Sequence, residues 1–69
     1  MEPFQTRVVE EHKELSIKVE ALRNFITGDK FKALPLKDCH LLIKQCSHME
    51  AYADILKERI DRFLLPFNS

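Results

Sequence analysis

Side chains that can be buried recur at alternating spacings of three and four along two long stretches of the chain, and neither stretch contains an internal glycine or proline. This spacing places them on one side of an α-helix and does not fit a β-strand. The first stretch has a seam of Val8, His12, Leu15, Val19, Leu22 and Ile26, which Phe4, Ala21 and Phe25 widen. The second has a seam of Cys39, Leu42, Cys46, Met49, Ala53, Leu56, Ile60 and Phe63. The pattern predicts an all-α chain.

One glycine and three prolines mark the ends of these stretches. Pro3 suits the first turn of a helix, where its missing N–H is not needed. Gly28 follows the first stretch as a C-terminal cap would. Pro35 precedes the second stretch and Pro66 ends it. The punctuation therefore predicts two long helices and a short connection.

We expect a single helical-hairpin domain over residues 1–69, with a helix over 3–27, a connector over 28–35 and a helix over 36–65. Because the connector is short, the two helices are expected to run antiparallel. Phe31 and Leu34 are expected to tuck under the hairpin in a short turn of helix.

The predicted hairpin has more apolar residues than one contact between two helices can cover. Outside the seams lie Val9, Ile17, Leu41, Ile43, Tyr52, Ile55, Leu65 and Phe67. A chain of 69 residues also has a small core, which usually needs support from disulfides, a metal or self-association. We therefore expect the hairpin to assemble into a homo-oligomer.

Disulfides and metal sites are not expected to supply that support. Cys39 and Cys46 stand two helical turns apart, roughly 10 Å, which exceeds the roughly 7 Å limit for a disulfide. Together with His12, His40 and His48 they lack the paired spacing that closed zinc sites use. The sequence thus predicts no metal and no cofactor.

Charge and composition argue against several classes of function. The 11 Lys and Arg residues balance the 11 Asp and Glu residues, so the basic excess that binds long DNA or RNA is absent. Cys46, Ser47 and His48 are adjacent in a helix and point about 100° apart, so they do not form a nucleophile–base pair. A single glycine excludes a glycine-rich phosphate loop. We expect a binding protein with no catalytic residues, and any phosphate contact must come from Lys and Arg side chains or helix N-termini.

Residues in both helices match a family of small phage proteins. The matching residues are Phe4-Gln5-Thr6-Arg7-Val8-Val9-Glu10-Glu11, Glu14-Leu15, Lys18, Leu22, Phe25-Ile26, Leu41-Leu42, Gln45, Met49, Tyr52, Leu56 and Arg59-Ile60. With these residues the chain resembles the anti-CBASS cyclic-oligonucleotide sponges over nearly its entire length. The resemblance implies a homohexamer of helical hairpins that binds cyclic dinucleotides such as cGAMP between subunits. It also implies cyclic trinucleotide binding at separate sites.

The resemblance further implies that the ligand is sequestered and not cleaved, so that CBASS effectors of the host lose their activating signal. The expected location is the cytoplasm of the infected bacterial host, because the sequence has no signal peptide and no apolar run that could span a membrane.

Four ligand-binding residues follow from the resemblance. Phe4 matches an aromatic, usually tyrosine, that stacks on a base, although the hydroxyl is missing here. Lys18 matches a lysine that contacts phosphate, Arg7 assists as a second cation, and Arg59 matches an arginine of the cyclic trinucleotide site. Phe4 and Lys18 are separated by about 20 Å of helix, so the site would combine Phe4 of one subunit with Lys18 of another.

The residues alone also fit plainer roles. Phe4 fits a hydrophobic staple at the start of the helix, and Lys18 fits an ion pair with Glu14. The alternative function is an oligomeric helical protein-interaction module that docks on a host protein. A helical regulator that binds nucleic acid is disfavoured by the neutral net charge.

Overall fold

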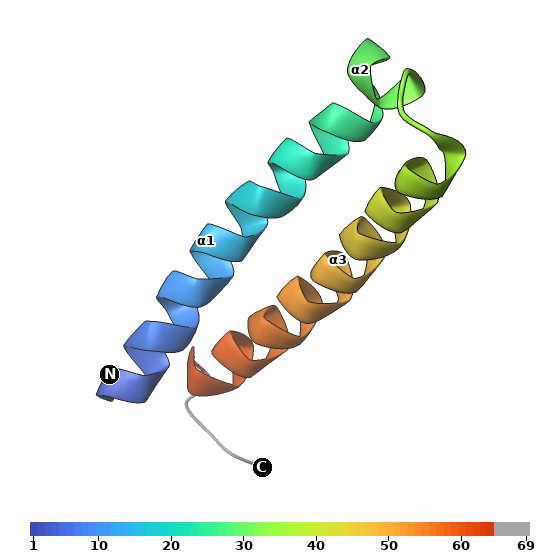
Figure 1. The fold of residues 1–69 in the computed structure, drawn as a ribbon. Coiled ribbons are helices and arrows are strands. Elements are labelled where there is room, and N and C mark those ends of the chain that lie inside the picture. Colours follow the sequence, from blue (N-terminus) through green and yellow to red (C-terminus); the bar gives the residue numbers. More distant parts are fainter. Residues whose placement is uncertain (65–69) are drawn as a thin grey trace.

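Helices make up nearly all of residues 1–64, which are the residues that the computed structural model describes. They are α1 (Pro3–Ile26), α2 (Asp29–Lys32) and α3 (Leu36–Leu64), and residues 1–64 contain no strand. Figure 1 shows α1 and α3 as two long helices side by side, with the short α2 at one end. The predicted all-α class is confirmed. Leu65, Pro66 and Phe67, which the sequence assigned to the end of the second helix and to the apolar surplus, lie outside the described residues.

Pro3 and its neighbours determine where α1 begins. Pro3 occupies the first helical position, as the sequence predicts. The preceding residue, Glu2, donates its backbone N–H to the side-chain oxygen of Gln5 at 2.9 Å. The backbone N–H of Thr6 donates to the carbonyl of Glu2 at 3.1 Å, which closes the first turn.

Gly28 does not end α1 in the left-handed conformation that a glycine cap usually adopts. Its φ of −95° and ψ of 173° are extended, and it precedes the first residue of α2. Thr27 ends α1 instead, and its hydroxyl donates to the carbonyl of Asn24 at 2.9 Å. The predicted glycine cap is therefore wrong, because the threonine hydroxyl satisfies a terminal carbonyl and the chain turns directly into the next helix.

The connector packs as the sequence predicts. Phe31 and Leu34 are half-buried, and Phe31 lies in the short helix α2. The ring of Phe31 meets that of Phe25 edge to face, with 6.3 Å between centroids. The thiol of Cys39 donates to the carbonyl of Phe31 at 3.3 Å, which ties the connector to the first turn of α3.

Three side-chain contacts between α1 and α3 establish the direction of the helices. The contacting pairs are Phe4 with Phe63, Glu11 with Tyr52, and Arg23 with Glu50. Residues later in α1 meet residues earlier in α3, so the helices are antiparallel (Figure 1). This is the arrangement that the short connector predicts.

The core lies along the predicted seams and is thin. Among residues 1–64, four side chains are buried: Val8, Val19, Cys46 and Leu56. Every other seam residue is half-buried, so the three-four spacing identified the contact between the helices correctly. The expected widening of the first seam is wrong for Ala21 and Phe25, which are exposed and lie beyond the narrow line along which two round helices touch. Phe4 is also exposed, but its ring reaches Phe63 of α3.

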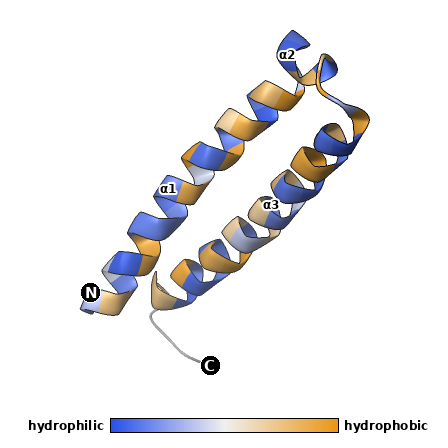
Figure 2. Ribbon diagram, viewed as in Figure 1, coloured by the Kyte–Doolittle hydropathy of each residue, from blue (hydrophilic) through white to orange (hydrophobic). Residues whose placement is uncertain are grey.

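Large apolar side chains remain on the surface of the hairpin. Ile17, Leu41, Ile43, Tyr52 and Ile55 are exposed, whereas Val9 is half-buried. Figure 2 shows hydrophobic segments recurring along the full length of both long helices. Most of the apolar side chains that were predicted to lie outside the seams are therefore exposed on the hairpin.

Leu56 is the most buried large side chain, with only 1% of its surface exposed. We expect Leu56→Ala to lower the free energy of unfolding by about 2–5 kcal/mol, because it leaves a cavity between the helices. Urea unfolding at one fixed protein concentration, followed by circular dichroism, measures the change. The matched control is Leu36→Ala, at a leucine that is 71% exposed, which should change this free energy by about 0.5 kcal/mol or less. Equal losses in the two variants would contradict the assignment of the core.

Candidate ligand-binding edge

The hairpin has two long edges, one on each side of the contact between α1 and α3. On one edge the hydroxyl of Tyr52 donates to the carboxylate of Glu11. On the other the guanidinium of Arg23 donates to the carboxylate of Glu50. Tyr52 and Glu50 are two residues apart and so point about 200° apart around α3, which places the two contacts on opposite edges. We name these edges the Tyr52 edge and the Arg23 edge.

The predicted site residues of α1 share the Tyr52 edge. Helical residues seven apart lie within about 20° of one another around the axis. Phe4 lies seven residues before Glu11, and Lys18 lies seven residues after it. Arg7 lies one turn before Glu11, four residues away. The edge that Glu11 marks therefore carries all three.

The predicted site residue of α3 lies on the same edge. Arg59 follows Tyr52 by seven residues and therefore stands nearly in line with it. Leu41 precedes Tyr52 by eleven residues, which is close to three full turns, and Ile55 follows it by three. Tyr52, Leu41 and Ile55 are exposed. The Tyr52 edge thus combines cations with an apolar surface.

The geometry of α1 keeps Phe4 and Lys18 apart within one chain. The helix is continuous from Pro3 to Ile26, so about 20 Å of its length separates the two. The ring of Phe4 packs edge to face on Phe63, with 5.7 Å between centroids, and remains 48% exposed. Phe4 therefore contacts the opposite helix, and it is the second residue of α1, whereas a hydrophobic staple uses the residue before the N-cap.

The cations of the Tyr52 edge are unpaired within the described chain. Arg7, Lys18 and Arg59 are exposed, and none forms an ion pair or side-chain hydrogen bond with residues 1–64. In particular, Lys18 does not pair with Glu14, which was its plainer role. An anion that approaches this edge meets positive charges without displacing a carboxylate from them.

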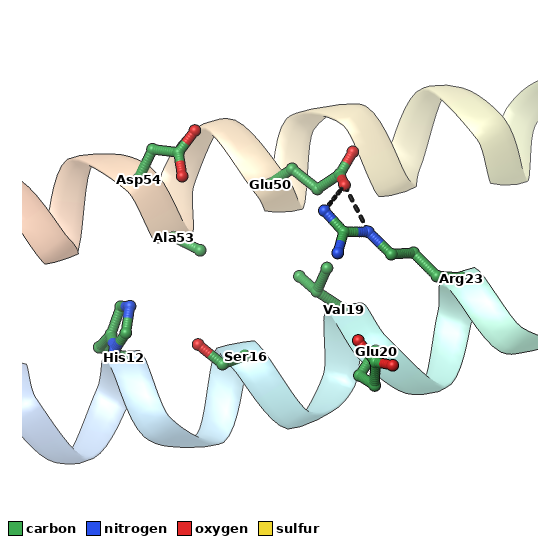
Figure 3. Close-up of a pocket in the computed structure, with 8 residues that line it drawn as sticks. All are labelled: His12, Ser16, Val19, Glu20, Arg23, Glu50, Ala53 and Asp54. Atoms are coloured by element: carbon green, nitrogen blue, oxygen red, sulfur yellow. Dashed lines mark hydrogen bonds and ion pairs between the residues drawn. The ribbon is translucent and has the colours of Figure 1, made fainter.

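The Arg23 edge has a different chemistry. A groove of about 490 Å³ follows this edge (Figure 3), lined by His12, Ser16, Val19, Glu20, Arg23, Glu50, Ala53 and Asp54. Arg23 reaches from α1 across to Glu50 on α3. The hydrogen bond and the negative charge of Glu50 raise the pKa of Arg23 above its ordinary value. Carboxylates outnumber cations here, so this groove does not suit a phosphate.

Tyr52 is an aromatic residue of this edge that the predicted site omits. From the sequence it was predicted only as one of the surplus apolar residues, although its spacing of seven to Arg59 would have placed the two on one face. Its hydrogen bond partner, Glu11, lies about 6 Å along α1 from Arg7 and about 10 Å from Lys18. Tyr52 thus meets α1 at a residue that lies between the two α1 cations.

Cysteines and carboxylates do not assemble into a metal centre in the part of the chain that the structure covers. Nowhere in residues 1–64 do three or more His, Cys, Asp or Glu side chains gather as a metal ion would require. Both cysteines are free thiols, with Cys46 buried and Cys39 half-buried. None of the described helices combines the length and apolar character needed to cross a membrane.

Comparison with known proteins gives one family and one relative. A family model described as Sequestin matches residues 2–62. A protein of Enterobacteria phage T4, described as an uncharacterized 7.5 kDa protein in the denB-rIIB intergenic region, is 37% identical over 60 residues. That alignment covers 87% of this chain and 94% of the phage protein. We found no match among solved structures.

These matches correct the family that the sequence suggested. The matching family is Sequestin and not the anti-CBASS cyclic-oligonucleotide sponges, so the resemblance to those sponges is wrong as an assignment. The residues quoted for it are common helix-forming and seam-forming types, which recur in unrelated hairpins. The expected link to phage proteins is supported by the phage T4 relative.

Proposed function

The chain belongs to the Sequestin family, and from the chemistry of the Tyr52 edge we propose that it binds cyclic dinucleotides between subunits of a homo-oligomer and holds them without cleavage. In the cytoplasm of an infected bacterium, such a protein would withhold the messenger from the host's CBASS effectors. The observation that carries the proposal is a set of three cations, Arg7, Lys18 and Arg59, that have no ion-pair partner in residues 1–64 and lie beside exposed aromatic and aliphatic side chains. The proposal does not depend on membership of the sponge family.

The chemistry of the ligand matches this edge. A cyclic dinucleotide carries two phosphate charges and two flat bases, so its site needs at least one placed cation per phosphate and an apolar surface per base. Lys18 and Arg7 supply cations, and Phe4 supplies an exposed ring. Two copies of the edge related by a two-fold axis would supply each group twice.

The separation of Phe4 from Lys18 supports a site that two subunits share. About 20 Å of helix lies between them, which is too far for one chain to hold both around one small ligand. Neither edge of a two-helix hairpin has a wall on its outer side. A second subunit would provide that wall and would bring its own Phe4 towards Lys18 of the first.

Exposed apolar side chains on several faces support an assembly larger than a dimer, and we propose the hexamer. Leu41 and Tyr52 are exposed on the Tyr52 edge, whereas Ile43 lines an apolar groove of about 390 Å³ on the Arg23 edge. Ile17 is 62% exposed on the outer side of α1. One two-fold contact would cover only one of these faces.

Arg59 belongs to the proposal as the cation of a second ligand, a cyclic trinucleotide. It lies on α3, across the hairpin from the α1 cations, and is exposed. A ligand with three phosphates needs several cations. Each chain contributes one Arg59, so the Arg59 side chains of several subunits would have to converge on the ligand.

We also propose that the protein binds the cyclic dinucleotide without catalysing a reaction on it. Arg7, Lys18 and Arg59 serve in this proposal as cations and hydrogen-bond donors to phosphate, and the site is assigned no nucleophile and no general base. A bound cyclic dinucleotide should therefore be released unchanged.

The first prediction of this proposal is self-association. We expect sedimentation velocity of the full chain to show an oligomer. Leu41→Glu should shift the distribution towards smaller species, because it places a charge within the apolar part of the Tyr52 edge. The control is Lys32→Glu, which adds the same carboxylate on an exposed position of α2 and should leave the distribution unchanged. A monomer at working concentrations would overturn the shared site.

Ligand binding is the second prediction. Isothermal titration with 3′,3′-linked and 2′,3′-linked cyclic dinucleotides should show binding, and Lys18→Ala should weaken it by about 1–3 kcal/mol, the range for a hydrogen bond to a charged group. The matched control is Lys13→Ala, because Lys13 lies on the same helix but points about 140° away from Lys18. Chromatography after the titration should recover the ligand intact.

The outcomes of this titration separate the two functions. Absence of binding at micromolar ligand would contradict sequestration and favour the alternative, an oligomeric helical module that docks on a host protein through its exposed apolar residues. Capture of one defined host protein by the wild-type chain, lost in Ile17→Glu, would then support that alternative, because Ile17 is among the most exposed large apolar residues.

A further inference from the structure

A carboxylate stands in the middle of the cations of the Tyr52 edge. Glu11 lies on α1 between Arg7 and Lys18, and it is exposed. Its Oε2 accepts the hydroxyl proton of Tyr52. Its Oε1 accepts no hydrogen bond from any of residues 1–64. This negative charge weakens the attraction of the edge for phosphate, so phosphate binding alone does not explain its position.

A carboxylate has a clear use beside a nucleobase. It is an acceptor without donors, so it attracts groups that present N–H and repels groups that present lone pairs. Guanine offers two adjacent N–H donors on its Watson–Crick edge, at N1 and N2. Adenine offers one donor, at N6, directly beside the lone pair of N1. The free oxygen of Glu11 therefore discriminates between the two purines.

The side chain of Tyr52 complements this chemistry. Its hydroxyl is held by Glu11, which fixes the direction of the ring, and the residue stays 43% exposed. A base stacked on an aromatic face gains affinity with little dependence on its identity. The ring would thus provide the stacking surface, and the carboxylate beside it would accept hydrogen bonds from the Watson–Crick edge of the base.

We propose that Tyr52 and Glu11 form a base-recognition element that prefers guanine, a proposal that rests on the cyclic dinucleotide function proposed above. Tyr52 stacks on the base, and Glu11 accepts hydrogen bonds from N1–H and N2–H. Arg7 and Lys18, about 6 and 10 Å along α1 from Glu11, contact the phosphates on either side. Tyr52 is then a ligand-binding residue in addition to Phe4.

The test compares cyclic di-GMP with cyclic di-AMP, which share their phosphates and sugars and differ only in the bases. Titration of the wild-type chain should give a dissociation constant at least about tenfold lower for cyclic di-GMP, in line with the discrimination that one good base contact provides. Glu11→Gln should reduce this ratio to about threefold or less, because the amide loses the charge and one acceptor. Tyr52→Phe should lower the ratio as well, since it keeps the ring but releases Glu11.

The matched control is Glu14→Gln, at the next exposed carboxylate of α1, which makes no hydrogen bond to Tyr52. It should leave the ratio unchanged, and circular dichroism should show full helix content in all three variants. If both ligands bind and the ratio is the same in wild type and Glu11→Gln, the base-recognition element is wrong and the sequestering function stands. If neither ligand binds the wild-type chain, both proposals are wrong.

Discussion

The contact of α1 with α3 along one narrow seam is the interaction on which the rest of the structure depends. Of the residues that the structure describes, only Val8, Val19, Cys46 and Leu56 are buried in it. A core of this size gives a small domain little stability of its own. The same narrowness leaves apolar side chains exposed on both edges and on the outer side of α1. The seam therefore holds the hairpin together, and its narrowness leaves exposed the apolar side chains that a second subunit would cover.

The seam also divides the polar residues into two sets. Once α1 and α3 face each other, residues to one side of the seam must join the Tyr52 edge and residues to the other side the Arg23 edge. Arg23 is engaged by Glu50, and carboxylates dominate the groove around them. Lys18 and Arg59, on the opposite edge, have no such partner in residues 1–64. A chain with zero formal net charge thus presents one edge with available cations and another with surplus carboxylates.

The fold was largely predictable, because helical periodicity is a local property of the sequence. The three-four spacing identified the buried and half-buried residues, and the prolines located the helices. Two predictions failed because they depend on how the helices pack. Phe25 was expected to widen the first seam but lies beyond it, and Thr27, not Gly28, ends α1. The edges were less predictable, because the Arg23–Glu50 contact joins residues 27 apart in the chain. The family was misassigned because its quoted residues are those that any amphipathic hairpin uses.

In the proposed assembly, binding and association are one equilibrium. A ligand that contacts Lys18 of one subunit and Phe4 of another binds only the associated form, so it stabilises that form by a free energy that rises with the logarithm of the ligand concentration over its dissociation constant. The unpaired cations also repel one another when two copies of the Tyr52 edge approach, and a ligand with two phosphates removes that repulsion. Glu11, between Arg7 and Lys18, moderates the same repulsion in the empty state. Its carboxylate therefore has a structural reason to be present before any base arrives, and the hydrogen bond to Tyr52 orients it for that encounter.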